Sequence, residues 1–223
     1  MEKQIDMNDI KGQEHVKRAL EVACAGRHSI LLVGPTGCGK TMLADRTGTI
    51  TDRPILTLDN ITERRTGALR RQIDRLEYLK KIIIAVMLPC PCGNFTSQKK
   101  ECRCMPKQIQ KHMAKVPDFI LDRIDIHVNV PELKYDEISA RRSGERSVDI
   151  KKRTDAVKLK KLEIDGEGVE LLKMAVMELG LSTRAYDKIV KIANTIACME
   201  GEPAIGSAHI SEAVSYRCMD RNL

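Results

Sequence analysis

A glycine-rich stretch near the start of the chain constrains the fold more than any other feature. Residues 34–41 read GPTGCGKT and match the pattern G-x-x-x-x-G-K-[ST]. The apolar run SILLVG precedes the stretch and a helix-forming segment follows it, which is the context that the pattern requires. Glycines let backbone N–H groups surround a phosphate, and the amino end of the next helix attracts the anion. The stretch therefore predicts a phosphate-binding loop between a buried strand and a helix.

The residues of this loop have different expected parts in binding. Lys40 is expected to reach the β- and γ-phosphates of a nucleotide, and Thr41 to help hold Mg²⁺. The other expected nucleotide contacts are Gly34, Pro35, Thr36, Gly37, Cys38, Gly39 and Met42.

A second apolar segment ends in an acid. Residues 55–60 read ILTLDN, and Asp59 is the expected acid on the magnesium side of the nucleotide. In enzymes that hydrolyse nucleotides, a second acid usually follows and helps an attacking water. Here Asn60 follows, and its amide has no carboxylate to accept a proton. We therefore place Asp59 and Asn60 among the candidate catalytic residues and leave hydrolysis open.

Strand-like and helix-like segments alternate in the first part of the chain. Short apolar runs at 29–34, 54–59, 81–88 and 124–130 are typical of buried strands. Residues 11–28 and 62–81 have the character of helices, with Gly26 as the expected stop of the first. This alternation predicts an α/β fold with a parallel sheet.

The pattern becomes helical after about residue 164. Three helices are expected, at 168–180, 182–201 and 206–219, with Ser182 and Ser207 as caps and Gly180 and Gly201 as stops. We therefore expect a nucleotide-binding α/β domain at 1–135, a linker at 136–150 and a small helical domain at 151–223.

Four cysteines form two close pairs. Cys90, Cys92, Cys102 and Cys104 have the spacing C-x-C-x9-C-x-C, and four thiolates can bind Zn²⁺ tetrahedrally. The pairs are tighter than the usual C-x₂₋₄-C spacing, so reduced cysteines in a loop remain the alternative.

Composition limits the classes of protein that remain. The eight cysteines accompany no apolar export signal, so a disulfide framework is not expected. Because no apolar run approaches the roughly 18–20 residues of a membrane span, we expect a cytoplasmic protein without a membrane partner. The net charge of +7 favours an acidic partner such as nucleotide or DNA, although a solvated basic surface explains the same excess. The basic segments 98–111 and 140–161 offer contacts to DNA phosphates but no aromatic residue to stack on bases.

Longer segments carry a family resemblance. Residues 9–43, 55–77, 88–93, 102–109, 120–131 and 181–197 occur in the order found in ComM-like proteins. These are bacterial AAA+ ATPases related to magnesium chelatase subunit I. The resemblance implies a P-loop AAA+ core of three layers around a parallel sheet, with a small C-terminal helical lid. It also implies ATP or ADP with Mg²⁺, bound between subunits of a ring, which is a homo-oligomer or includes a different subunit.

The resemblance assigns further roles to particular residues. It implies that Ile10, Lys11 and Gly12 line the adenine, and that Arg123 contacts the γ-phosphate held by a neighbouring subunit. It implies that Arg184 senses the nucleotide of its own chain. ComM-like members are implicated in DNA processing during natural transformation, and chelatase relatives drive Mg²⁺ insertion into porphyrin.

The chain also departs from the family pattern. Asn60 stands where the family has Glu, and Leu88 stands where it has the Asn of MNPCPCG. Segments 42–54 and 78–81 are shorter than in the family, and we expect the family's separate N-terminal domain to be missing as well. We therefore favour a shortened, degenerate member that binds ATP and hydrolyses it weakly or not at all. The alternatives are an active AAA+ motor on DNA and a zinc-stapled module that binds nucleic acid.

Overall fold

A parallel sheet forms the centre of the computed structural model, which describes residues 6–63, 67–68, 71, 81–134, 137, 139 and 144–220. Its strands are β1 (Ile30–Val33), β2 (Ile55–Leu58), β3 (Ile82–Met87) and β4 (Ile126–Asn129). They lie in the order β2-β3-β1-β4, and every neighbouring pair is parallel. The expected α/β fold is confirmed. The connection that follows β1 runs past β3 to β2, and the connection that follows β3 runs the other way, past β1 to β4. The carboxyl end of β1 therefore lies where two connections run in opposite directions.

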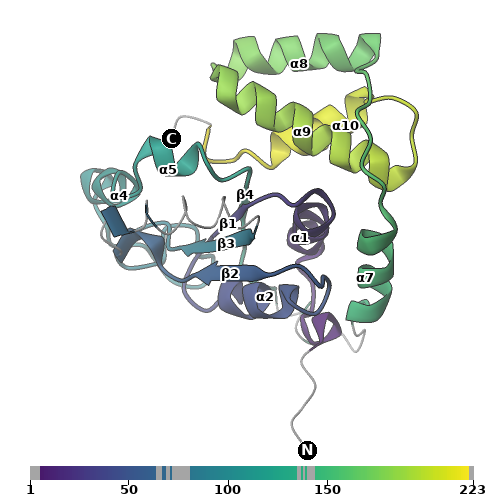
Figure 1. Cartoon of the computed structure of the whole chain (residues 1–223). Coiled ribbons are helices and arrows are strands. Elements are labelled where there is room, and N and C mark those ends of the chain that lie inside the picture. Colours follow the sequence, from purple (N-terminus) through teal and green to yellow (C-terminus); the bar gives the residue numbers. More distant parts are fainter. Residues whose placement is uncertain are drawn as a thin grey trace, which may run out of the picture.

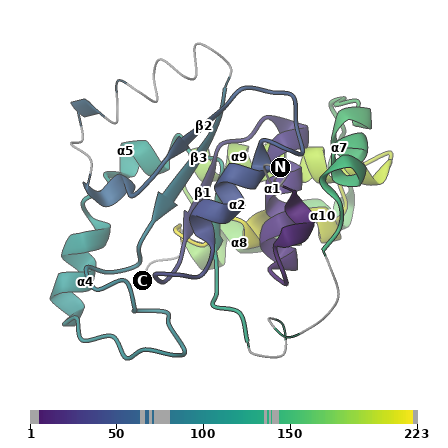
Figure 2. The same cartoon turned by 90° about the horizontal axis from the view of Figure 1, so that it is seen from below.

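Helices cover both faces of the sheet, because its strands are apolar on both sides. Ile30 and Leu32 of β1 pack into one hydrophobic cluster, whereas Leu31 and Val33 pack into another. The first cluster includes α1 (Glu14–Gly26) and α2 (Lys40–Thr47). The second lies toward α4 (Pro106–Met113) and α5 (Asp118–Leu121), and Figure 2 shows the sheet between these two sets of helices. The three-layer core is therefore present.

Two short 3-10 turns complete the first part of the chain. They are η1 (Met7–Asp9) and η2 (Ile61–Glu63). The charged helix expected at 62–81 lies mostly outside the described residues.

Helix α7 (Ser147–Ala156) packs against α1. The backbone N–H of Met7 donates to Ser147 Oγ at 2.7 Å, and Thr154 Oγ1 donates to the Ile50 carbonyl at 3.0 Å. Residues 151–156 were expected in the helical domain, but α7 is tied to the α/β part. The exact division of the chain into domains stays a prediction.

The C-terminal helices form a separate group above the sheet in Figure 1. They are α8 (Gly166–Leu179), α9 (Thr183–Glu200) and α10 (Ser207–Ser215). The stops at Gly180 and Gly201 are confirmed, since both have left-handed φ angles of 60° and 76°. The cap at Ser182 is confirmed, because its Oγ accepts from the Ala185 N–H. The cap at Ser207 is wrong: Gly206 is the cap and Ser207 is already helical.

The C-terminal helices and the sheet share one continuous core through α1. Helix α9 packs on α1, and Thr195 of α9 lies 2.8 Å from the His28 ring. The expected stop of the first helix at Gly26 is shifted by one residue. Gly26 is helical, and Arg27 takes the left-handed conformation with φ 60°. Gly26 has a packing reason instead, because a Cβ there would lie 2.1 Å from His28 Nε2.

Within the described part of the chain, no helix combines the length and the apolar character that crossing a bilayer requires.

Candidate nucleotide-binding site

The glycine-rich loop connects β1 to the amino end of α2. Gly37 and Gly39 have φ angles of 83° and 94°, which are strained for any residue with a side chain. A Cβ on Gly34 would lie 2.3 Å from the Val130 carbonyl oxygen. Glycine is therefore required at each of these positions. The loop directs the positive end of the α2 dipole toward the space in front of it.

The Lys40 side chain is folded across its own loop. It is buried, and its Nζ donates to the Pro35 carbonyl at 2.6 Å and lies 3.6 Å from Cys38 Sγ. Burial raises the pKa of the Cys38 thiol, so this neighbour is neutral. A phosphate in front of the loop would compete with one uncharged carbonyl for the ammonium group.

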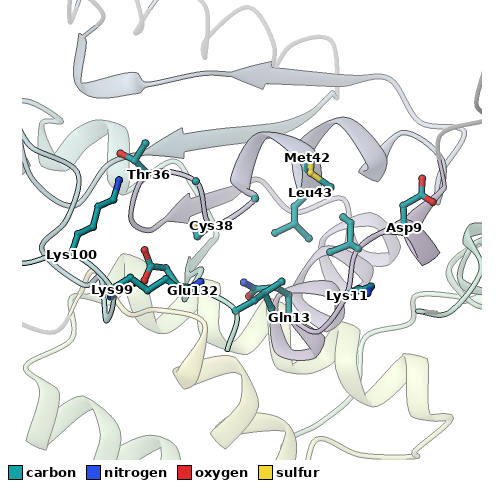
Figure 3. A pocket seen from close by; sticks show the side chains of 14 residues that line it. Asp9, Lys11, Gln13, Thr36, Cys38, Met42, Leu43, Lys99, Lys100 and Glu132 are labelled. Atoms are coloured by element: carbon teal, nitrogen blue, oxygen red, sulfur yellow. Dashed lines mark hydrogen bonds between the residues drawn. The ribbon is translucent and has the colours of Figure 1, made fainter. Parts of the chain in front are cut away.

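A pocket of about 450 Å³ opens beside the loop, which is within the usual range for small-molecule sites. Figure 3 shows it between the loop, the segment before α1 and the segment after β4. Its lining residues are Asp9, Ile10, Lys11, Gln13, Thr36, Gly37, Cys38, Gly39, Met42, Leu43, Lys99, Lys100, Glu132 and Leu133.

The two ends of the pocket differ in chemistry. Met42 and Leu43 lie toward one end in Figure 3, where Asp9 and Lys11 also lie, and Ile10 belongs to the same lining. Thr36 and Lys100 lie at the other end, together with Lys99 and Glu132. One end thus offers apolar side chains among charged ones, and the other offers two lysines beside a glutamate and the glycine-rich loop.

The wall opposite the loop is held by a tight turn. Gly12 has φ 57°, and a Cβ there would lie 2.8 Å from Leu133 Cδ2. Gln13 follows with φ 58°, and its Nε2 donates to the Pro131 carbonyl at 2.5 Å. This turn fixes Ile10 and Lys11 against the pocket, so Gly12 supports the site without lining it.

Asp59 and Asn60 follow β2, at the edge of the sheet. Leu58 and Leu31 both pair with Ala85, so Asp59 leaves the sheet level with Leu32. It is two strand spacings, about 10 Å, from β1. Asn60 is left-handed with φ 46°, and its Oδ1 accepts from Thr62 Oγ1 at 3.0 Å. Neither residue belongs to the lining of the pocket.

The segment after β3 packs directly on the phosphate loop. The Thr36 N–H donates to the Gly93 carbonyl at 3.0 Å, and a Cβ on Gly93 would lie 2.3 Å from Thr36 Oγ1. Leu88 is half-buried in this segment, and its carbonyl lies 3.1 Å from the His112 ring. The Leu88 side chain offers no hydrogen bond there.

The four clustered cysteines are brought together. Cys90, Cys92, Cys102 and Cys104 place their sulfurs within 4.8 Å of one another. The Cys90–Cys92, Cys90–Cys102 and Cys92–Cys102 sulfur distances are 3.4, 3.7 and 3.7 Å. A hydrogen bond from the Asn94 backbone, with help from the neighbouring thiols, lowers the pKa of Cys92 to about 6. This cluster could hold a metal ion.

Arg123 and Arg184 lie near the amino ends of the strands, and the loop lies at the carboxyl end of β1. Arg184 Nη1 donates to Asp122 Oδ2 at 2.7 Å. Asp125 bonds the backbone of Ser29, just before β1 begins. Residues 122–125 are therefore at the amino ends of the strands, whereas the loop is at the carboxyl end of β1. A role for Arg184 at the nucleotide of its own chain stays a prediction.

The structure thus brings together some expected site residues and adds others. Ile10, Lys11, Thr36, Gly37, Cys38, Gly39 and Met42 share the pocket, with Gly34, Pro35, Lys40 and Thr41 in the loop beside it. The lining residues that the motifs did not indicate are Asp9, Gln13, Leu43, Lys99, Lys100, Glu132 and Leu133. The sequence feature that could have pointed to Lys99 and Lys100 is their position as adjacent lysines between the two cysteine pairs.

Two family models match this chain. The family model described as "Magnesium chelatase, subunit ChlI" matches residues 6–70 and 55–138. A second, "Magnesium chelatase, subunit ChlI C-terminal", matches residues 133–217.

Curated relatives match almost the whole chain. "Uncharacterized protein YifB" of Salmonella typhimurium is 31% identical, covering 98% of this chain and 61% of the relative. "Competence protein ComM" of Haemophilus influenzae is 28% identical, again with 98% and 61% covered. "Uncharacterized protein YifB" of Escherichia coli is 28% identical, with 99% and 62% covered.

The fold defines an α/β protein with a glycine-rich loop between β1 and α2 and a C-terminal helical region. The chain belongs to the magnesium chelatase subunit ChlI family, whose models match both parts. It spans about three fifths of the length of its curated relatives. The alignment with the Salmonella protein runs over 312 positions, more than the 223 residues of this chain, so it crosses segments that this chain lacks.

Proposed function

We propose that this chain binds ATP and ADP with Mg²⁺ in the pocket beside residues 34–41 and hydrolyses ATP slowly or not at all. The observation that carries the proposal is the loop itself. Its left-handed Gly37 and Gly39 and the following helix open onto a pocket with apolar side chains toward one end and two lysines at the other. The adenine fits the end with Ile10 and Met42, and the phosphates fit the end with Thr36.

The magnesium ion has two expected protein partners. The Thr41 side chain is exposed at the start of α2, beside the phosphate position. Asp59 is about 10 Å from β1 across two strand spacings. Because Mg²⁺ usually keeps several of its waters, we propose that Thr41 binds the ion directly and that Asp59 acts through a water.

Weak hydrolysis follows from two missing groups. Asn60 cannot accept a proton, and its side-chain oxygen is engaged by Thr62. Leu88, which directly follows β3 between β1 and β2, cannot orient a water. Loss of acid–base help costs on the order of 10²–10⁴ in rate. An active motor on DNA is the alternative, and DNA-stimulated turnover would favour it.

We further propose that the cysteine cluster binds one Zn²⁺. With Zn–S bonds of about 2.3 Å, a tetrahedral site has sulfurs about 3.8 Å apart. The sulfur distances of 3.4–3.7 Å that join Cys90, Cys92 and Cys102 are close to this value. Elemental analysis of purified protein should find about one equivalent of zinc.

The positions of the arginines support a proposal about assembly. Arg123 and Arg184 lie at the amino edge of the sheet, and the pocket lies at the carboxyl edge. An arginine of one subunit therefore approaches a nucleotide most directly when the amino edge of one copy faces the carboxyl edge of the next. We propose a head-to-tail assembly of this kind, such as a ring of this chain alone or with a related subunit, in the cytoplasm.

Isothermal titration calorimetry tests the central proposal. Wild-type protein should bind Mg-ATP and Mg-ADP saturably, and Lys40→Ala should lose most of that affinity because its Nζ meets the β/γ-phosphates. Lys107→Ala, an exposed lysine in α4, is the matched control and should bind as wild type does. No binding by wild type at millimolar nucleotide would contradict the proposal.

A further inference from the structure

The loop between the two cysteine pairs reaches the cationic end of the pocket. Lys99 and Lys100 both line the pocket, although they are more than fifty positions from the phosphate loop in sequence. In Figure 3 the Lys100 side chain extends toward Thr36, and Lys99 lies next to Glu132. Both lysines are exposed, so their ammonium groups are available to a ligand.

Glu132, in the segment that follows β4, anchors this loop. Glu132 accepts hydrogen bonds from Ser97 Oγ at 2.9 Å and from the backbone N–H groups of Gln98 and Lys99 at 3.2 Å. Its two oxygens are therefore engaged by the loop. A carboxylate at the phosphate end of a pocket would repel the ligand unless it had such a structural task.

The two ends of this loop are anchored by the cysteine cluster, and its first residue also contacts the phosphate loop. Cys92 and Cys102 bracket residues 93–101, and their sulfurs are 3.7 Å apart. The Gly93 carbonyl accepts from the Thr36 N–H, so the loop begins on the phosphate loop itself. A metal on the cysteines would fix both ends of the segment that carries the lysines.

We propose that residues 94–101 form a second cationic arm of the nucleotide pocket, in which Lys99 and Lys100 bind the phosphate chain. The arm is held in place by Glu132 and by a metal ion on the four cysteines. This inference rests on the proposed nucleotide binding and extends it. The two lysines supply charge at the phosphate end in addition to Lys40, and charge-assisted hydrogen bonds to phosphate are the strong kind.

A series of ligands and variants tests the arm. The double variant Lys99→Ala with Lys100→Ala should weaken ATP binding by on the order of tenfold or more, and adenosine binding by far less. The double variant Lys107→Ala with Lys111→Ala, which removes two exposed lysines of α4, is the charge-matched control. If wild type binds no ATP, the proposed function itself fails. If wild type binds ATP and the double variant binds it equally well, only the arm is contradicted.

Glu132→Ala separates anchoring from simple electrostatics. If Glu132 were only a nearby negative charge, its removal would strengthen ATP binding. If it anchors the arm, its removal should weaken ATP binding at least threefold, as the proposal predicts. Unchanged or tighter binding by this variant would contradict the anchoring role.

The metal is tested through binding rather than turnover. Cys92→Ser with Cys104→Ser should lose bound zinc and weaken ATP binding in the same direction as the lysine variant. Coupling between two sites is reciprocal, so ATP should also raise the zinc affinity of wild-type protein. Equal ATP affinity with and without metal in folded protein would show that the arm does not depend on it.

Discussion

Neighbouring side chains lie so close to the Gly26 backbone that no residue with a Cβ atom fits at this position. A Cβ there would meet His28 Nε2 at 2.1 Å and Thr195 Oγ1 at 2.6 Å. His28 is buried and bonded to Thr195, so its ring cannot move aside without breaking that contact. Gly166 differs, because a Cβ there would meet nothing within 4 Å.

Gly26→Ala should therefore lower the free energy of unfolding by about 1–3 kcal/mol, as overpacking does. Gly166→Ala should leave it unchanged or raise it by about 0.4–1 kcal/mol, because alanine restricts the unfolded chain. Urea unfolding of both variants measures the difference. An equally stable Gly26→Ala protein would show that α1 and α9 are not packed as described.

Asn60 combines a chemical loss with a conformational preference. It is left-handed with φ 46°, a region that Asn tolerates and Glu disfavours. The short polar side chain also accepts from Thr62. Asn60 therefore lacks the carboxylate of Glu but suits the left-handed turn better than Glu would.

The double change Asn60→Glu with Leu88→Asn should raise ATP turnover if subunits assemble so that Arg123 reaches the neighbouring site. It should also cost about 1–2 kcal/mol of stability, because Glu enters the left-handed region. Phosphate release and urea unfolding test the two parts. Asn60→Glu alone is the control, and it should gain less because Leu88 still offers no hydrogen bond. Intact ATP binding with unchanged turnover in the double variant would contradict the roles given to these positions.

At the scale of elements, the strands and the helices α1, α8 and α9 could be predicted from sequence. Their apolar runs and capping residues act locally, as at Ser182 and Gly201. The place of Lys99 and Lys100 could not be predicted, because it depends on Glu132, far along the chain. Gly26 was misjudged as a simple stop because the His28 ring that excludes a side chain is placed by tertiary packing.

The cysteine loop makes an element-scale prediction. If Zn²⁺ holds the loop, a strong chelator should remove about one equivalent and lower the melting temperature, since metal binding contributes to folding. The variant Cys198→Ser is the control, because Cys198 lies in α9 outside the cluster, and it should keep its zinc. Purified protein that contains no zinc, and whose melting temperature does not change with chelator, would contradict the zinc site and indicate four reduced thiols.

At the scale of the whole molecule, the C-terminal helices and the sheet meet around His28. Burial is the main cause that lowers the pKa of His28 from 6.5 to about 4, with Asp125 opposing and Lys188 adding to the shift. The folded protein therefore keeps this ring neutral where the unfolded chain already binds a proton. Stability should be unaffected by His28 above about pH 6.5 and should fall as the pH decreases toward 4, by about 3 kcal/mol in total.

His28→Gln should reduce this slope. The measurement is the free energy of unfolding between pH 7 and about pH 4 for wild type and variant, compared by slope rather than by absolute value. His15→Gln is the control, because His15 is exposed, and it should keep the wild-type slope. Identical slopes for His28→Gln and wild type would contradict a buried, neutral His28.

The central claim is that this chain binds ATP through its phosphate loop without turning it over at an ordinary enzyme rate. Calorimetric titration with Mg-ATP and a phosphate-release assay on the same sample test it most directly. We predict saturable binding that depends on Lys40, together with phosphate release close to the uncatalysed background. Turnover at about 1 s⁻¹ or faster, the lower end for ordinary enzymes, and its loss in Lys40→Ala would contradict the account.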